Sequence, residues 1–247
     1  MNKRNRLYRE VADQIALLIK NGKYQVGERL PSERELASTM QVSRPTIREA
    51  MIALEIAGQI EVRTGAGIFI LDPEMAADLG LNADIGPGPF ELIEARIHFE
   101  GEAAALAAIR ISEGELQALD KACKEMTLCV ESKQSAEQAD QAFHELIATA
   151  TRNSAIIFTI EQLWSFRTRM PMWNRLHEII ANLEGEPGWT NDRKTLMDHQ
   201  RILNALRARD SEAARHAMRT HLEHVREALL KASEHDAIGN DLLVKSK

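Results

Sequence analysis

The sequence has few of the residues that mark membrane, secreted or zinc-finger proteins. It contains only two cysteines, Cys123 and Cys129, in 247 residues, too few for a cysteine-based zinc site. No run of about 18 apolar residues occurs, so no membrane span is expected. The basic start MNKRNRLYRE lacks the apolar segment that follows in a secretory signal. We therefore expect a cytoplasmic protein whose two thiols are reduced and buried.

Aromatic residues are also scarce, at 4% of the chain, whereas apolar residues make up 44% and charged residues 28%. The last two proportions are ordinary for globular proteins, so disorder of the whole chain is not expected. Alanine, leucine, isoleucine, glutamate and arginine dominate, which favours helices. A length of 247 residues allows one or two domains, at roughly 150 residues per domain.

The net charge of −6 is divided unevenly along the chain. Residues 1–71 carry 11 basic and 8 acidic side chains, a net charge of +3, whereas residues 72–247 carry 20 basic and 29 acidic ones, a net charge of −9. This asymmetry suggests that only the N-terminal part approaches a polyanion. An excess of three charges can also arise by chance, so charge alone does not identify the partner.

Residues 1–71 predict a winged helix-turn-helix, with three helices followed by a β-hairpin. Apolar residues recur at helical spacing over residues 8–19. A capping box at Ser32 and a capping serine at Ser43 begin two further helices. Over residues 60–71 the apolar period changes to two around a glycine-rich turn, which is typical of a hairpin.

The rest of the sequence predicts a mostly α protein with an all-α second domain. Residues 72–88 are rich in glycine and proline and predict a linker, and residues 89–235 have a helical pattern throughout. Capping boxes are expected at Ser112 and Ser135, and residues 236–247 are expected to form a flexible tail. The bundle should contain six or seven helices, near 89–110, 113–132, 136–151, 154–169, 172–183, 191–209 and 211–233.

The third predicted helix carries polar and basic residues in its first turn, outside an apolar inner face. In a helix-turn-helix this end enters the major groove, where arginine can pair bidentately with guanine. An arginine one helix earlier could hold a phosphate, and the wing glycines let the backbone approach the duplex closely. Any one of these arginines alone could simply be a solvated surface residue. Arg44, Thr46 and Arg48 are expected to point outward from this helix. Together with the wing, the predicted DNA contacts are Arg34, Arg44, Thr46, Arg48, Gly65 and Gly67.

Four residues of the helical part have the types and spacing of a metal site. Asp140 and His144 stand at i and i+4 and share one helix face, about 6 Å apart. Two antiparallel neighbouring helices could bring His199 and His221 together. One oxygen and three imidazoles suit zinc, nickel or another borderline first-row ion. Spacing leaves a simpler alternative open, because a helical histidine is usually a partly exposed polar residue. That surface position is expected for His98, His216, His224 and His235.

Three ordered blocks in the first domain resemble the DNA-binding domain of GntR-family regulators. They are LPSERELA at 30–37, VSRPTIREAM at 42–51 and RTGAGIFI at 63–70. The resemblance covers residues 7–71 and supports the same DNA contacts, with the wing glycines at the minor groove. It also implies a homodimer on a near-palindromic operator.

The second domain is similar to the FCD effector-binding domain of the FadR subgroup. The similarity is carried by DQAFHELIATATRNSAI at 140–156, DHQRILNAL at 198–206 and RTHLEHV at 219–225. In that family an aspartate and three histidines bind a metal, which implies a divalent ion, zinc first and nickel or manganese as alternatives, on Asp140, His144, His199 and His221. The family also implies an arginine facing an effector carboxylate, and Arg96 stands in that pattern. The alternative for Arg96 is a salt bridge to Glu100.

Nearly the whole chain further resembles hexuronate-utilisation repressors (UxuR/ExuR type). The likeness rests on GPFELIEAR at 88–96, MPMWNRLHE at 170–178 and the DHQRILNAL block. It implies a sugar-acid effector, such as glucuronate, galacturonate or an aldonate, whose carboxylate and adjacent hydroxyl could chelate the ion. The polyol end could meet Arg167, Arg169, Trp173 and His177. Trp164 and Trp173 could equally be core residues.

Three functional hypotheses follow. The first is a metal-containing repressor of sugar-acid catabolism, in which effector binding respaces the DNA-binding heads and lowers operator affinity. The second is a metal-dependent enzyme, because a His/carboxylate site is chemically competent. The proposed site has no evident general base beyond its ligands, since Glu145 lies on a neighbouring helix face, so we expect no enzyme. The third is a metal sensor, although a buried four-ligand site favours a structural or effector-coordinating ion.

Overall fold

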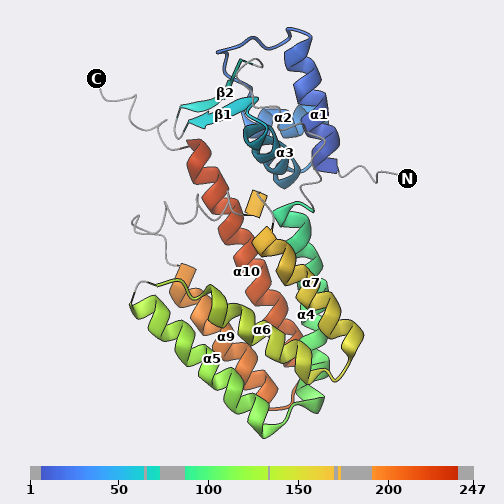
Figure 1. Ribbon diagram of the computed structural model, residues 1–247, viewed down its shortest axis with the longest axis vertical. Coiled ribbons are helices and arrows are strands. Elements are labelled where there is room, and N and C mark those ends of the chain that lie inside the picture. Colours follow the sequence, from blue (N-terminus) through green and yellow to red (C-terminus); the bar gives the residue numbers. More distant parts are fainter. Residues whose placement is uncertain are drawn as a thin grey trace. The chain divides into compact units, whose positions relative to one another are not determined.

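The computed structural model describes residues 7–63, 66–72, 87–132, 134–169, 172–173 and 191–238 (Figure 1). The chain divides into two compact units. The first comprises residues 1–90, 169–185 and 229–247, and the second comprises residues 91–168 and 186–228. Within the described residues, no helix is both long and apolar enough to cross a membrane.

The predicted winged helix-turn-helix is confirmed, and we call its described residues, 7–72, the head. Its elements are α1 (Leu7–Lys20), α2 (Glu33–Met40), α3 (Arg44–Ile56), β1 (Ile60–Arg63) and β2 (Gly67–Ile70) (Figure 1). Helices α1 and α2 both pack against α3, and α3 also packs against β1. The core of this part is apolar, with fully buried side chains that include Tyr8, Ile15, Ile47 and Leu54.

Local hydrogen bonds explain where α2 and α3 begin. Ser32 and Glu35 form the expected capping box, and the Oγ of Ser43 accepts a hydrogen bond from the backbone N–H of Thr46 at 3.2 Å. Gln41 ends α2 in the left-handed region, at φ 56°, which lets the chain turn sharply into α3. These contacts hold the first turn of α3 in place.

The wing is a two-stranded antiparallel hairpin. Strand β1 pairs with β2 in a register that sets Ile60 opposite Ile70 and Arg63 opposite Gly67. Gly67 has a φ of +112°, and a Cβ at this position would lie 2.3 Å from the Nε of Arg29. The positive φ therefore favours glycine here, whereas the side chain of Arg29 could move away from a Cβ. Gly65, the other wing glycine predicted to contact DNA, lies outside the described residues.

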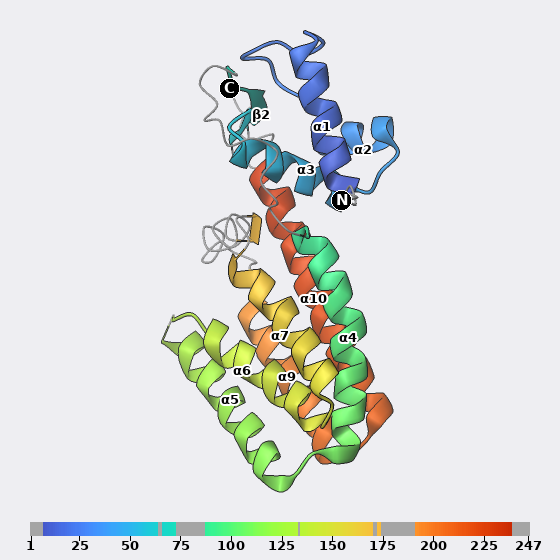
Figure 2. The same cartoon turned by 45° about the vertical axis from the view of Figure 1, so that its right-hand side comes forward.

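The predicted helical bundle is also confirmed (Figure 2). Its helices are α4 (Pro89–Arg110), α5 (Glu113–Glu131), α6 (Glu137–Ala150), α7 (Ser154–Arg169), α9 (Asn191–Arg207) and α10 (Ser211–Ile238). Helix α5 packs against both α6 and α9. The capping box at Ser112 forms as expected, with its Oγ accepting from the N–H of Glu115 at 3.4 Å.

Two boundaries differ from the sequence-based expectation. Helix α6 has Ala136 as its N-cap with no side-chain cap, because the Oγ of Ser135 accepts from the N–H of Glu137 and makes no box with Gln138. Helix α10 continues through Ile238, so the first residues of the expected tail are helical. The sequence offers α10 no glycine or proline between residue 233 and Gly239, and nothing local stops it earlier.

Some predicted segments fall mostly outside the described residues. Met172 and Trp173 are helical, as expected for the segment 172–183, and its remaining residues are not described. The same holds for residues 73–86 of the predicted linker.

The interior of the bundle is not uniformly apolar. An apolar cluster of Ala103, Ala148, Ile160 and Trp164 joins α4, α6 and α7. Beside such contacts lies a set of buried polar and charged side chains: Arg96, Glu100, His144, Asp198, His199 and His221. Buried charges are costly unless they are paired or bind a cation, so this polar interior points to the site.

Candidate metal centre

Four side chains from three helices converge inside the bundle. Asp140 and His144 come from α6, His199 from α9 and His221 from α10, and one ligand atom from each lies within 4.8 Å of the others. The three histidines are at most 2% exposed. The structure therefore brings together all four residues that the sequence singles out as metal ligands.

The outer nitrogens of two of these histidines face hydrogen-bond acceptors. The Nδ1 of His144 contacts the Oε2 of Glu100, and the Nδ1 of His199 lies 2.9 Å from the carbonyl oxygen of Thr195. A carboxylate and a carbonyl can only accept, so both Nδ1 atoms must carry a proton. In a neutral ring the lone pair is then on Nε2.

Those Nε2 atoms both face the same carboxylate oxygen. The Oδ1 of Asp140 lies 3.0 Å from the Nε2 of His199 and 3.7 Å from the Nε2 of His144. These three atoms are buried and have no well-aligned hydrogen-bond partner. In the neutral rings, acceptors face one another, an arrangement that a cation bound between them would satisfy. The residues present thus fit a metal ion.

The electrostatic surroundings keep the donor groups in their binding forms. Burial alone would raise the pKa of Asp140, but the contact with His199 and the charges that His144, His199 and Arg167 carry when protonated outweigh it and hold that pKa well below its usual range. Burial, together with the charges of His199 and His144, lowers the pKa of His221 well below its ordinary value. An ionised aspartate and a neutral imidazole are the forms that bind metals.

The outer carboxylate of Glu100 is also held ionised. Burial by itself would raise the pKa of Glu100, but the charges of Arg96 and His144 and the hydrogen bonds from both lower it to about 2. One oxygen and three imidazoles form a donor set that suits zinc, with nickel and manganese as alternatives.

Arg96 is buried beside this cluster, at 3% exposure. Its Nε donates to the Oε1 of Glu100 at 2.6 Å, and its guanidinium carbon lies 4.1 Å from the centroid of the Trp164 ring. The salt bridge that the sequence left as the alternative for Arg96 is therefore present. Contact with an effector carboxylate stays a prediction.

Of the four residues suggested to contact the polyol end of the effector, the described part of the structure places only one beside the cluster of candidate metal ligands. Arg167 is 9% exposed, and its Nη1 donates to the Oδ2 of Asp140 at 3.2 Å, which puts it beside the cluster. Arg169 is exposed and Trp173 is buried, and both belong to the first compact unit. His177 lies outside the described residues. Roles in effector binding stay predictions for all four.

Sequence reasoning missed two polar contacts around the centre. Glu100 was considered only as a partner of Arg96, yet it also contacts His144. His224, expected at the surface, is half-buried, and its Nδ1 lies 2.6 Å from the Oδ2 of the buried Asp198. The available signals were weak: Glu100 is one of four glutamates in α4, and Asp198 stands directly before His199.

In the head, Arg34 and Arg44 are exposed and Thr46 is partly buried. Arg48 differs from the expectation that it points outward: it is 3% exposed, and its Nε lies 2.9 Å from the Oε1 of Glu33 on α2. The buried face of α3 is wider than its apolar residues alone suggest, and the opposite charge of Glu33 allows the guanidinium to be buried there. DNA contacts of these residues stay predictions.

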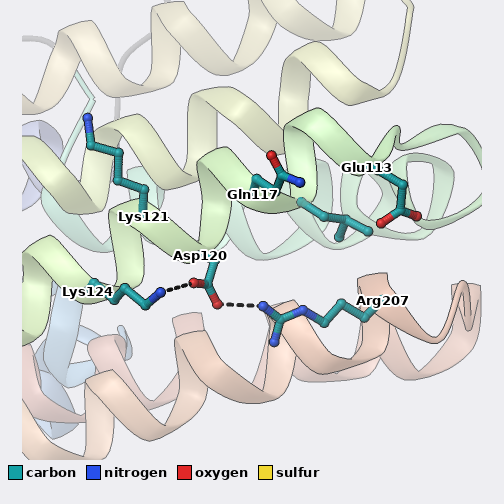
Figure 3. A pocket seen from close by; sticks show the side chains of 7 residues that line it. Glu113, Gln117, Asp120, Lys121, Lys124 and Arg207 are labelled. Atoms are coloured by element: carbon teal, nitrogen blue, oxygen red, sulfur yellow. Dashed lines mark hydrogen bonds and ion pairs between the residues drawn. The ribbon is translucent and has the colours of Figure 1, made fainter.

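A surface groove of about 550 Å³ lies between α5 and α9 (Figure 3). Asp120 bridges Lys124 and Arg207 across it, with the Nζ of Lys124 at 2.6 Å. These charges satisfy one another, whereas the Asp/His cluster has unsatisfied buried atoms. The cluster is therefore the stronger candidate for a functional site.

Comparison with known proteins assigns both domains. The model of bacterial regulatory proteins of the gntR family matches residues 7–70, and the FCD domain model matches residues 91–224. The chain belongs to the GntR family. This GntR-family protein is thus a DNA-binding transcription regulator rather than an enzyme, with an FCD domain as its helical part.

Relatives of this GntR-family chain extend over nearly its whole length. The Uxu operon transcriptional regulator of Escherichia coli (strain K12) is 39% identical over 238 residues, covering 94% of this chain and 90% of that protein. The Exu regulon transcriptional regulator of the same strain is 35% identical over 241 residues, covering 94% and 87%. Among solved structures, Streptococcus agalactiae GntR is 27% identical, covers 89% of this chain and 99% of its own, and has a TM-score of 0.47.

Proposed function

We propose that this regulator is a metal-containing repressor of sugar-acid catabolism that a hexuronate or aldonate releases from its operator. One observation supports a bound metal ion. The Oδ1 of Asp140 faces the Nε2 atoms of His144 and His199 in the buried interior, and none of these three atoms has a hydrogen-bond partner among the described residues. The sugar-acid effector is supported by the relatives, which are named as Uxu operon and Exu regulon regulators.

The proposed metal ligands are Asp140, His144, His199 and His221. Zinc is the first expectation, and nickel or manganese are alternatives. When bound, the ion would supply a Lewis-acidic position for the carboxylate and neighbouring hydroxyl of the effector.

Two arginines next to the ligands are the proposed receptors for the charge of the effector. The guanidinium carbons of Arg96 and Arg167 lie 4.1 and 4.9 Å from the centroid of the Trp164 ring. A stacked guanidinium keeps its planar donors oriented for a bidentate contact with a carboxylate. Arg169, Trp173 and His177 are retained as candidates for the polyol end, on the basis of the family resemblance alone.

The head would carry the operator contacts. We propose a cytoplasmic homodimer, because a regulator of transcription acts where DNA is and a near-palindromic operator needs two heads. Exposed Arg34 and Arg44, with Thr46 and the wing glycines Gly65 and Gly67, would face the duplex. In the absence of DNA, Arg48 would connect α3 to α2 through its ion pair with Glu33.

A thermal-shift screen of the zinc-loaded full chain tests the proposed function. The panel contains hexuronates, aldonates, lactate, citrate and fatty acids, because a ligand that binds only the folded state raises the melting temperature with its concentration. We expect a shift with hexuronates or aldonates that disappears in Arg96→Ala and His199→Ala. The same acids should weaken operator binding in a fluorescence-anisotropy titration.

Other outcomes of this screen would replace parts of the proposal. A shift with lactate or another acid alone would overturn the sugar-acid assignment. Release from the operator by zinc without any acid would favour the metal sensor.

A further inference from the structure

The proposed metal ligand His144 is held by a carboxylate from a different helix. Glu100, on α4, is 2% exposed, and its Oε2 accepts a hydrogen bond from the Nδ1 of His144 on α6. The contact lies in the interior of the bundle, where hydrogen bonds are strong because water does not compete.

The other oxygen of Glu100 is equally constrained. Its Oε1 accepts from the Nε of Arg96 at 2.6 Å, and Arg96 is itself stacked on Trp164. With a fixed donor on each oxygen, the carboxylate has one orientation. That orientation requires the Nδ1–H form of His144 and directs Nε2 toward Asp140.

The two histidines next to Asp140 are therefore held differently. His199 donates its Nδ1–H to the carbonyl oxygen of Thr195, a neutral acceptor one turn away on its own helix. His144 donates to a carboxylate on another helix. A carboxylate partner raises the basicity of an imidazole ligand more than a neutral carbonyl does.

We propose that Glu100 is the positioning residue of the metal centre. It sets the tautomer and orientation of His144, strengthens that imidazole as a ligand, and joins the centre to Arg96 through its second oxygen. The inference rests on the proposed metal site, and deepens it by assigning a function to a residue that would touch neither the ion nor the effector.

The first test measures the tautomer without any metal. A long-range proton–nitrogen NMR spectrum of the metal-free full chain at about pH 8, with His144 assigned from a His144→Asn variant, should show the proton on Nδ1. The Glu100→Gln variant should shift this Nδ1 proton upfield, because a neutral amide is a weaker acceptor. Finding Nδ1 unprotonated in the unmodified chain would overturn the inference even if no variant folds.

The second test measures zinc affinity by competition with a chromophoric chelator. Glu100→Gln should weaken zinc binding by about 10- to 100-fold, the usual effect of losing an outer partner of a ligand. Glu102→Gln is the matched control on the same helix: Glu102 is 58% exposed and pairs with Arg215, away from the four ligands. Its zinc affinity should be unchanged.

The two tests separate the inference from the proposed function. If the unmodified chain binds zinc and Glu100→Gln binds it as tightly as Glu102→Gln does, Glu100 has no positioning role. If the unmodified chain does not bind zinc, nickel or manganese, the proposed metal function is overturned together with this role. The visible spectrum of the cobalt-loaded variants adds a readout of ligand geometry, and it should change in Glu100→Gln but not in Glu102→Gln.

Discussion

The head and the helical bundle bury charge in different ways. In the head, Arg48 and Glu33 form an ion pair at the edge of an apolar core. In the bundle, one aspartate and three histidines meet in the interior, and the Oδ1 of Asp140 faces the Nε2 atoms of His144 and His199. The pair in the head joins opposite charges across two helices, whereas a cluster of hydrogen-bond acceptors that face one another identifies a place for a cation.

The largest expected effect concerns stability in the head. Arg48→Ala removes the ion pair between a buried guanidinium and the carboxylate of Glu33, which should destabilise the head by about 3–5 kcal/mol. Chemical denaturation of the full chain measures this change. Replacing both residues together, as in Glu33→Met with Arg48→Met, should restore most of the loss. An Arg48→Ala variant as stable as the parent would show that the pair does not stabilise the head.

The next effect concerns the metal, and it should be confined to the bundle. His199→Ala removes a ligand and should weaken zinc binding by at least about 100-fold, beyond what loss of an outer partner causes. Chelator competition gives the value, and His216→Ala, an exposed histidine on α10, is the control. Equal affinities of the two variants would contradict the assignment of His199 as a ligand.

Arg44 should behave opposite to Arg48, four residues away on the same helix. Because Arg44 is exposed, Arg44→Ala should change the stability of the head by less than about 0.5 kcal/mol. It should nevertheless weaken specific operator binding by about 1–3 kcal/mol. Fluorescence anisotropy with operator and unrelated DNA separates the two effects. Unchanged operator affinity would remove Arg44 from the DNA-binding surface.

The smallest expected effect is a difference between the head and the bundle in how much stability each loses as the pH is lowered. The pKa of His221 is lowered in the folded metal-free chain, so below pH 6.5 the unfolded state takes up a proton that the folded state does not. His221 should therefore make the bundle less stable as the pH is lowered below 6.5, and this one group contributes at most about 1.4 kcal/mol for each pH unit. Both tyrosines lie in the head and Trp164 lies in the bundle, so fluorine NMR of fluorinated tyrosine and of the Trp164 signal follows the two parts separately. Equal acid sensitivity of both would contradict the expected difference.

Local rules explain why most of the architecture could be predicted. Ser32, Ser43 and Ser112 cap helices where their spacing indicates, because a cap depends on residues three positions apart. The end of α10 was placed too early, since no breaker occurs before Gly239. The cap at Ser135 was wrong because a serine can accept from either of two neighbouring N–H groups, and the backbone decides which.

Less of the candidate site than of the fold could be predicted from the sequence. Asp140 and His144 share a helix face by spacing alone, whereas helical spacing only allowed His199 and His221 to join them, and the family resemblance was the stronger argument for including both. The burial of Arg48 depends on Glu33 of another helix, and helical periodicity does not contain that neighbour.

The sequence by itself determined the two-part organisation, the elements and the ligand types, because these depend on periodicity, caps and residue chemistry close along the chain. Only the tertiary structure decided which atoms meet. Glu100 and His144 are 44 positions apart, and only the packing of α4 against α6 brings a carboxylate to the outer nitrogen of a metal-ligand candidate. Such a contact has no local pattern, since it is set by how helices pack rather than by how each one forms.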